Sequence, residues 1–303
     1  LPADTCYCET CAAIASLMWN WRLLLITGDS RYADLFERTL YNGVLCSPSL
    51  QGDSYLYVNP LHVRSGRYVR ASDNMGADAG EAPLRPAWHS CACCPPNVRR
   101  LFSRLGNYLA TSTEQVVQIH QFGTMRLKAV VHDEPVALNM ATDYPWDGTI
   151  ELRVRKSPRQ PWALSLRVPA WCDQFTVSIN DDAVAAPQVE RGYVRLERRW
   201  QPNDTVVVTM EMPPRFTVPD PRIDAVRGCV AIERGPLVYC LESHDQPESV
   251  DLLDVQVDPS ASLRLGAASH WPEMVALGLS GQQPRSLGDG ALYHEVSGVT
   301  PPG

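Results

Sequence analysis

The chain has 303 residues, of which 45% are hydrophobic and 20% charged, the composition of an ordinary globular protein with two or three domains. A net charge of −7 argues against a nucleic-acid or anionic-membrane partner, and by eye no apolar run approaches the roughly 20 residues of a membrane-spanning helix. Ten cysteines are too few for a disulfide scaffold, so we expect a reducing compartment and a cytoplasmic location.

Two helices are expected near the start of the chain. Residues 9 to 27 are apolar nearly all round and are followed by Gly28, which predicts a helix buried on most of its sides. Asp29 and Ser30 can cap a second helix, because apolar residues then recur at three- and four-residue spacings up to residue 45.

A long loop and a third helix follow. Residues 47 to 90 are rich in Gly, Ser, Pro and Asp, and residues 54 to 61 are their one strand-like piece. Loops of this length in compact domains are usually functional. Pro95 and Pro96 suit the first turn of a helix that continues to about residue 109. Three helices cannot close a domain of their own, so we expect the chain to begin inside a larger domain and to expose an apolar surface.

From about residue 115 the hydrophobic period changes from 3.6 to 2. Seven alternating or β-branched runs, separated by Pro, Gly, Asn and Asp, predict an antiparallel β-sandwich over residues 114 to 215. A second β-rich domain is expected over residues 216 to 303, with little pattern after about residue 245. The helical part then occupies residues 1 to 113.

The segment HSCACCPPNVRR places Cys91, Cys93 and Cys94 at the start of the third helix. Unpaired N–H groups and the helix dipole favour an anion there, so Cys93 and Cys94 should ionise more readily than free cysteine. Glu9 and Cys11 occupy the equivalent place in the first helix, and together the four residues could bind Zn²⁺ tetrahedrally. The long gap between the two pairs is a weak constraint, so buried or redox-active thiols remain an alternative.

Six segments carry a resemblance to a known family. They are ETCA at 9–12, ERTLYN at 37–42, YLYVNPL at 55–61, CACCPPN at 91–97, RVPAWC at 167–172 and ERGPLVYCLE at 233–242. They resemble glycoside hydrolase family 127, the β-L-arabinofuranosidase family. The resemblance implies an α+β multidomain fold, in which the C-terminal part of an (α/α)6 barrel precedes antiparallel β-sandwich domains. It also implies that the N-terminal part of the barrel is missing from this chain.

The same resemblance implies a retaining glycosidase that releases non-reducing-end β-L-arabinofuranose, or a related sugar, from a carbohydrate substrate. Glu9, Cys11, Cys93 and Cys94 would hold a zinc ion. Cys93 would also be the nucleophile, because a zinc-bound thiol is already deprotonated at neutral pH. The family's acid/base glutamate lies upstream of the ETC segment, so no residue of this chain is expected to take that role.

Five other side chains are expected to take no part in the reaction itself. Glu37 and Tyr57 lie in the matched segments and are expected to contact the sugar, because sugar sites use polar and aromatic groups. His62 and His89 are expected to be loop histidines. Cys91 is expected to pack beside the ion without binding it, because four ligands complete the shell.

Two other functions compete with the enzyme. A closed shell of four protein ligands is the usual mark of a structural zinc, so a zinc-stapled fragment or carbohydrate-binding module without turnover is the alternative. A redox protein that uses Cys93 and Cys94 is disfavoured, because adjacent cysteines lack the CxxC geometry.

Overall fold

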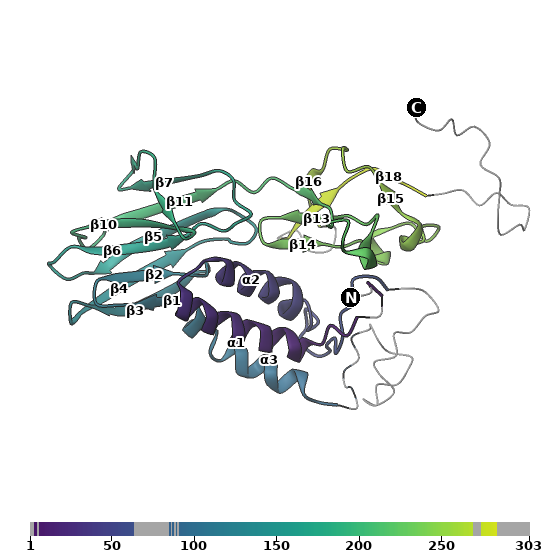
Figure 1. Cartoon of the computed structure of the whole chain (residues 1–303), viewed down its shortest axis with the longest axis horizontal. Helices are drawn as coiled ribbons and strands as arrows, with labels where there is room; N and C mark the ends of the chain where they lie inside the picture. The colour runs from purple at the N-terminus through teal and green to yellow at the C-terminus, as the bar shows by residue number, and fades with distance from the viewer. Residues whose placement is uncertain are drawn as a thin grey trace, which may run out of the picture.

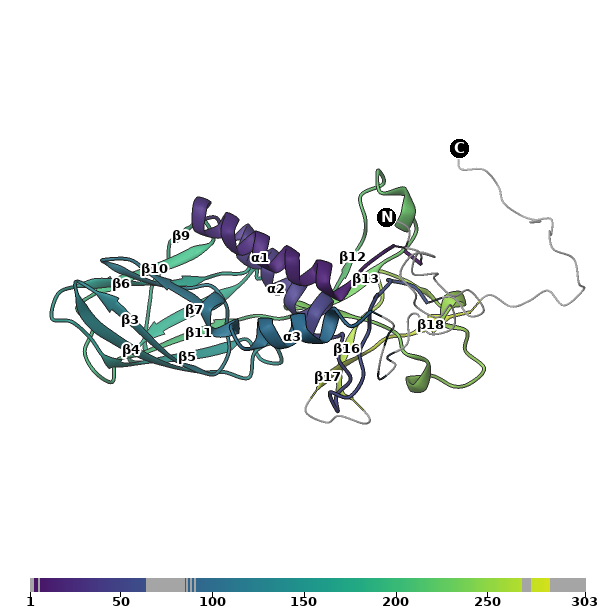
Figure 2. The same ribbon diagram turned by 90° about the horizontal axis from the view of Figure 1, so that it is seen from below.

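Helices, a β-sandwich and a smaller β region follow one another along the chain (Figure 1). The computed structural model describes residues 3, 4, 6–63, 85, 87, 89, 91–268 and 274–283. Much of the expected loop over 47 to 90 and the end of the chain therefore lie outside the described residues. In two perpendicular views the helices lie where the sandwich and the smaller β region meet (Figures 1 and 2).

The helical part contains three α-helices and two short irregular turns. They are α1 (Thr10–Thr27), α2 (Arg31–Thr39), the π-helix η1 (Leu40–Leu45), α3 (Cys94–Phe102) and the 3-10 turn η2 (Leu105–Tyr108). As expected, α1 ends at Gly28, whose φ of 65° lies in the left-handed region that glycine adopts without strain. A small apolar core holds these helices together: Ile14, Leu17, Phe36, Leu40, Val44 and Leu101.

Much of the apolar surface of α1 is exposed, so the expectation of a helix buried on most sides is wrong for this chain. Trp19 is 64% exposed and Ile26 is 79% exposed. The physical reason is that, among the described elements, α2, η1 and α3 cover only one side of α1. The exposed apolar surface expected of the helical part is therefore present.

The composition of α1 also corrects the hydropathy argument. With 18 residues and a mean hydropathy of 1.2, it is long and apolar enough to cross a membrane by these two criteria alone. Core helices of soluble proteins pass the same test, and Ile14 and Leu17 of α1 are buried against neighbouring helices. One such helix is weak evidence of a span, because a signal sequence near an N-terminus passes the same two criteria as well.

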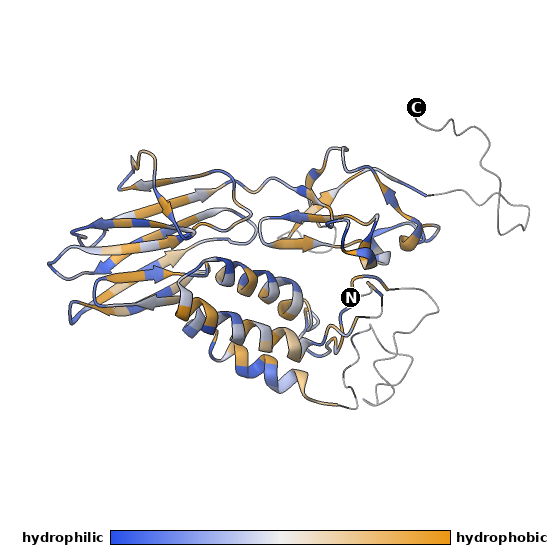
Figure 3. Ribbon diagram, in the orientation of Figure 1, coloured by the Kyte–Doolittle hydropathy of each residue, from blue (hydrophilic) through white to orange (hydrophobic). Residues whose placement is uncertain are grey.

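Two packed sheets form the β-sandwich. The five-stranded sheet has the order β1 (Ala110–Ser112), β2 (Val116–Ile119), β6 (Trp162–Arg167), β10 (Tyr193–Arg198) and β9 (Val189–Glu190). The six-stranded sheet has the order β3 (Met125–Val131), β4 (Glu134–Ala141), β5 (Thr149–Lys156), β11 (Thr205–Met210), β7 (Phe175–Ile179) and β8 (Asp182–Ala183). All pairings are antiparallel except that of β2 with β6. Hydrophobic residues lie along the sandwich strands and the helices (Figure 3), and the inward-facing ones make the largest core.

The smaller β region is built from short strands. It contains β12 (Arg215–Thr217), β13 (Ala231–Arg234) and β14 (Leu237–Tyr239) in one sheet, and the pairs β15 (Gln256–Val257) with β18 (Gly281–Gln282) and β16 (Arg264–Ala267) with β17 (Val275–Gly278). Single 3-10 turns are η3 (Asp224–Val226), η4 (Ser243–Asp245) and η5 (Leu252–Asp254). The first strand of the sandwich, β1, begins at Ala110, and the first strand of this smaller region, β12, begins at Arg215.

A buried ion cluster joins α2 to the sandwich. Arg167, at the end of β6, is 0% exposed and contacts the carboxylates of Asp34, at 2.5 Å, and of Glu37. The Tyr144 hydroxyl and the Trp171 indole N–H also donate to Glu37, at 2.6 Å and 3.4 Å. The expected sugar contact of Glu37 is therefore wrong, because its carboxylate is buried and its oxygens already serve protein donors.

The next residues of the helix join the smaller β region. Glu233 of β13 is buried and accepts hydrogen bonds from Arg38 and from Arg215, both at 2.6 Å. The Asn42 side chain donates to the carbonyl oxygen of Pro236 at 2.9 Å and accepts from the backbone N–H of Val238 at 2.8 Å. Residues 37 to 42 thus hold both β regions in place.

Replacing Glu37 tests the buried cluster. In Glu37→Gln, Arg167 loses its closest counter-charge while it remains buried, so we expect the free energy of unfolding to fall by about 3–5 kcal/mol. Denaturant unfolding measures this change. Glu197→Gln, which breaks the exposed pair of Glu197 with Arg195, should cost less than about 1 kcal/mol. If the free energy of unfolding fell equally in the two variants, the buried cluster would not be a special source of stability.

His120 is a buried base beside this cluster. Its Nδ1 lies 2.8 Å from the Tyr193 hydroxyl, its Nε2 lies 2.9 Å from the Thr111 hydroxyl, and its carbonyl oxygen accepts from Arg167. Burial, and then the charge of Arg167, lower the pKa of His120 to about 3. The folded protein therefore keeps this imidazole neutral in mild acid.

The stability of the protein should consequently depend on pH. An unfolded histidine binds a proton below about pH 6.5, whereas the folded state does so only near pH 3, so the free energy of unfolding falls as the pH drops between these values. We expect a loss of about 2 kcal/mol between pH 7 and pH 5 from this residue. Denaturant unfolding across that range should show a shallower pH dependence in His120→Asn. The control variant His132→Asn, at a turn of the sandwich, should show the same pH dependence of unfolding as the wild type. If its pH dependence became as shallow as that of His120→Asn, the effect could not be attributed to His120.

Candidate metal centre

Four potential metal ligands meet where α1 and α3 begin. Glu9 precedes α1 and Cys11 is its second residue, whereas Cys93 precedes α3 and Cys94 is its first residue. One ligand atom from each residue lies within 4.8 Å of the other three. The structure thus brings together the set expected from the sequence, which we call the ligand group.

The separations within the ligand group suit a tetrahedral zinc ion. The Sγ atoms of Cys11 and Cys94 are 3.7 Å apart, those of Cys93 and Cys94 are 3.8 Å apart, and Cys93 Sγ is 3.4 Å from a Glu9 carboxylate oxygen. Zn–S bonds of about 2.3 Å and a Zn–O bond of about 2.0 Å place tetrahedral sulfurs about 3.8 Å apart and a sulfur and an oxygen about 3.5 Å apart. The donor types and these three separations therefore fit zinc, and the other separations are all within 4.8 Å.

The strand-like piece over residues 54 to 61 holds the start of α1. Glu9 forms an isolated antiparallel bridge with Val58, and the backbone N–H of Thr10 donates to the Tyr57 carbonyl at 3.0 Å. The Thr10 hydroxyl also donates to the carbonyl oxygen of Leu56 at 2.9 Å. The piece forms bridges instead of a full strand, and its bonds fix Glu9 and Cys11 relative to the rest of the site.

Proximity makes the thiols of the ligand group hard to ionise by themselves. Burial, followed by hydrogen bonds with Cys11, Cys91 and Glu9, raises the pKa of Cys93 to about 12. Burial and the nearby charges of Cys11 and Cys93 also raise the pKa of Cys94. The expectation that the helix dipole would ease ionisation is wrong, because burial outweighs it, and for Cys94 the repulsion from neighbouring thiolates adds to the effect. A cation would offset that repulsion, which favours a metal-bound state.

Asn97 is a positioning residue that the sequence analysis did not single out. Its side-chain amide donates to Cys11 Sγ at 2.9 Å, and Arg100 donates in turn to the Asn97 oxygen. Such outer contacts orient metal ligands. The signal was present in the sequence, since Asn97 follows Cys94 by three residues on a helix and so lies on the same face.

Tyr57 and His89 pack against the ligand group. The buried Tyr57 hydroxyl accepts from Tyr7 at 3.1 Å and shares a hydrogen bond with Cys93, and burial is the main cause of its raised pKa. A sugar contact of Tyr57 stays a prediction. His89 is buried, and the centre of its ring lies 5.7 Å from the centre of the Tyr57 ring. Its Nε2 lies 3.1 Å from the Tyr55 carbonyl oxygen.

The remaining expected neighbours lie outside the ligand group. His62 and His89 are not members of the four-residue set found among the described residues. Cys91 packs beside Cys93 and Cys94 and is also outside the set, and its expected role as a neighbour that does not bind the ion stays a prediction.

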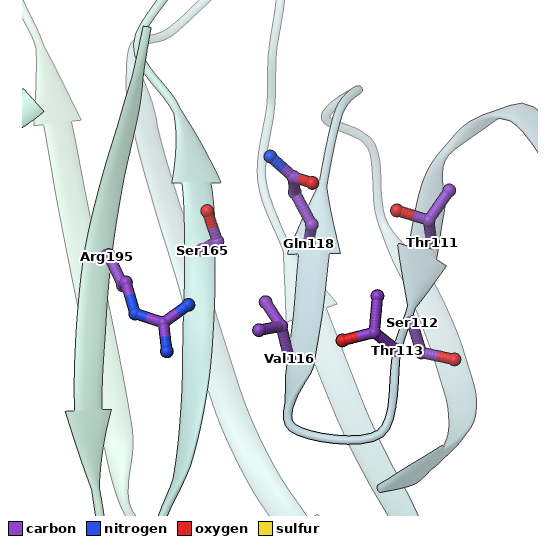
Figure 4. A pocket seen from close by; sticks show the side chains of 7 residues that line it. All are labelled: Thr111, Ser112, Thr113, Val116, Gln118, Ser165 and Arg195. Carbon is purple, nitrogen blue, oxygen red and sulfur yellow. The ribbon is translucent and has the colours of Figure 1, made fainter. Parts of the chain in front are cut away.

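A separate polar hollow lies on the sandwich. Its volume is about 180 Å³, and Figure 4 shows the lining side chains on β1, β2, β6, β10 and the turn between β1 and β2: Thr111, Ser112, Thr113, Val116, Gln118, Ser165 and Arg195. These side chains offer hydroxyl, amide and guanidinium groups, but no carboxylate pair or thiol. We therefore locate the chemistry at the ligand group, where nucleophilic and metal-binding side chains converge.

Comparisons with known proteins agree along most of the chain. Residues 1–107 match the β-L-arabinofuranosidase GH127 catalytic domain, residues 116–212 the GH127 middle domain, and residues 214–276 the glycoside hydrolase family 127 C-terminal domain. A non-reducing end β-L-arabinofuranosidase of Bifidobacterium longum subsp. longum is 31% identical over 255 residues, which make up 82% of this chain and 37% of the relative.

Solved structures show the same relationship. A GH127 β-L-arabinofuranosidase from Geobacillus stearothermophilus T6 superposes with a TM-score of 0.87 at 34% identity, covering 98% of this chain and 46% of that one. A GH127 β-arabinofuranosidase superposes with a TM-score of 0.82 at 30% identity, covering 93% and 44%. The chain thus spans less than half the length of each of these relatives.

Removing a ligand tests the metal centre. Purified protein should carry about one zinc per chain, and Cys11→Ala or Cys94→Ala should lower both the zinc content and the melting temperature, because metal binding is coupled to folding. Elemental analysis and thermal unfolding provide the two readouts. Cys46→Ala, outside the ligand group, should retain its zinc. Wild-type protein without zinc, with all its thiols freely titrating, would disprove the site.

Proposed function

Because the chain belongs to glycoside hydrolase family 127, we propose that the protein is a retaining glycosidase that releases β-L-arabinofuranose, or a related sugar, from the non-reducing end of a carbohydrate. The observation that carries the proposal is the position of Cys93 beside Glu9, Cys11 and Cys94. We also propose that α1, α2 and α3 belong to an (α/α)6 barrel, for which the exposed apolar surface of α1 offers a packing face.

Zinc is the proposed cofactor, and Glu9, Cys11, Cys93 and Cys94 are its proposed ligands. When bound, the ion supplies positive charge that keeps the thiols deprotonated at neutral pH. The tetrahedral spacing of the donor atoms and the Asn97 contact to Cys11 support this assignment.

Cys93 is the proposed nucleophile. Its sulfur attacks the anomeric carbon while the bond to the leaving oxygen breaks, which inverts that carbon and links the sugar to Cys93 as a thioglycoside. Water then displaces the sulfur with a second inversion, so the product retains its configuration. The buried Tyr57 side chain packs beside the Cys93 thiol.

A retaining glycosidase also needs a carboxylic acid that protonates the leaving oxygen and later activates water. Glu9 is the carboxylate in contact with Cys93 among the described residues, but it belongs to the ligand group. A metal-bound carboxylate is a weak acid, so Glu9 does not suit this role. We assign the acid/base to no residue of this chain.

The competing function is a zinc-stapled module without turnover. One observation favours it: the ligand group already offers four protein donors, the closed shell typical of structural zinc. In that case the ion would join the starts of α1 and α3, and Cys93 would be a ligand only. The two functions differ in whether the Cys93 sulfur reacts with a sugar.

An activated substrate distinguishes these functions. An aryl β-L-arabinofuranoside with a very good leaving group needs little protonation, so the zinc-loaded chain should release about one phenol per molecule and carry a pentose on Cys93. Further turnover should be about 10²–10⁴-fold slower than in an enzyme with its general acid. Absorbance and peptide mass spectrometry measure the two products.

Two variants provide the controls for this experiment. Cys93→Ser should lose both the burst and the adduct, because serine is a much weaker nucleophile than a thiolate. Cys91→Ser should keep both, since Cys91 lies outside the ligand group. Zinc-loaded protein that forms no adduct on Cys93 would support the stapled module instead.

A further inference from the structure

We propose that Cys6 and Cys8 form a redox-active thiol pair, a disulfide-forming modification site distinct from the ligand group. Their Sγ atoms are 3.1 Å apart, closer than the sulfurs within the ligand group at 3.7 Å and 3.8 Å. Both cysteines are free thiols in the structure, and neither belongs to the four-residue set.

The backbone brings the two thiols together. The N–H of Cys8 donates to the Cys6 carbonyl at 3.0 Å, an i to i+2 bond that places Tyr7 at the centre of a three-residue turn. The carbonyl of Cys8 then accepts from the N–H of Asn59 at 3.0 Å, which anchors the turn to the piece over residues 54 to 61. A disulfide bond is about 2.05 Å long, so the sulfurs need to approach by only about 1 Å.

The thiols outside the ligand group and this pair make other contacts. Cys46 donates to the Asn42 carbonyl at 3.0 Å, and Cys172 donates to the Gln174 carbonyl at 3.2 Å. The Cys240 thiol faces a carboxylate oxygen of Glu242. Cys6 and Cys8 differ from these three thiols because their sulfurs contact each other.

The oxidant we propose is a small-molecule disulfide such as oxidised glutathione. Cys8 is the more accessible thiol, since Cys6 is only 4% exposed, so the Cys8 sulfur attacks first. A bond forms between Cys8 and one glutathione sulfur, the other glutathione leaves as a thiolate, and that thiolate takes up the proton lost by Cys8. Cys6 then attacks the Cys8 sulfur and expels the second glutathione, which takes up the proton lost by Cys6. Two protein thiols are oxidised and one disulfide is reduced to two thiols.

The pair is connected to the ligand group through its own segment. Cys8 directly precedes Glu9, and Tyr7 donates from the turn to Tyr57, which in turn bonds to Cys93. A disulfide bond between Cys6 and Cys8 would make the turn more rigid, and it would not use a residue of the ligand group. This inference does not depend on the proposed glycosidase activity.

Exchange with oxidised glutathione tests the pair in the zinc-loaded full chain. The wild-type protein should lose two titratable thiols, retain its zinc, and yield a peptide over residues 6 to 8 that is lighter by two hydrogens. Disulfides that involve Cys11, Cys93 or Cys94 should form at least about tenfold more slowly, because their sulfurs are occupied by the ion.

Substitutions identify the order of the two steps. Cys6→Ser should accumulate a stable glutathione adduct on Cys8, because the resolving thiol is gone. Cys8→Ser should leave Cys6 largely unmodified, and Cys46→Ser should behave as the wild type. The proposal fails if the wild-type protein accumulates a stable glutathione adduct on Cys8, as is expected only of Cys6→Ser. It also fails if Cys6 and Cys8 both stay reduced, or if disulfides within the ligand group form before the Cys6–Cys8 disulfide.

Discussion

The arrangement of the chain depends on the charge of Arg167, which lies inside the protein with no access to solvent. A buried guanidinium is stable only if acceptors surround it, so α2 must present Asp34 and Glu37 to it. These carboxylates are three residues apart on one helical face, and a rotation of α2 would remove both together. The interaction therefore sets the rotation of α2 on the sandwich, and Arg38 and Asn42 extend the same constraint to the smaller β region.

The geometry of the ligand group depends on how the helices pack on one another. α1 packs on α2 through the small helical core, and α3 packs on α1 through the same residues. The beginnings of α1 and α3 are therefore held near each other by apolar contacts before any ion is considered. The hydrogen bonds between residues 8 to 10 and residues 56 to 59 then adjust the position of Glu9 and Cys11.

Local signals predicted a large part of the fold and the composition of the site. The end of α1 at Gly28 and the start of a helix beside Pro95 follow from short-range chemistry, as does the change to strands, which was expected from about residue 115 and begins at Ala110. The pairing of Glu9 and Cys11 with Cys93 and Cys94 was suggested by donor types, although the resemblance was needed to choose zinc over other thiol chemistry. β4 was missed although its apolar residues alternate, and the strand pairs after residue 245 were missed because those strands are only two to four residues long.

The errors came from partners that are distant in the sequence. Glu37 was read as a sugar contact because nothing in its own segment reveals Arg167, which follows it by 130 residues. The thiol pKa values were misjudged because the helix dipole is a local property, whereas the burial of Cys93 and its hydrogen bonds with Cys11, Cys91 and Glu9 arise only on folding. The exposure of α1 likewise depends on which elements pack against it.

The parallel pairing of β2 with β6 has a consequence for how the chain reaches this structure. β3, β4 and β5 lie between these neighbours in the sequence, yet they belong to the opposite sheet. The five-stranded sheet therefore cannot form by successive hairpins, and the chain must cross the sandwich before β2 finds its central partner. Such non-local contacts raise the contact order, and the loop entropy is lost before the pairing is gained. Until β6 arrives, β2 has one free edge and Arg167 is not in place for α2, so docking of the helices belongs to the late, slow part of folding.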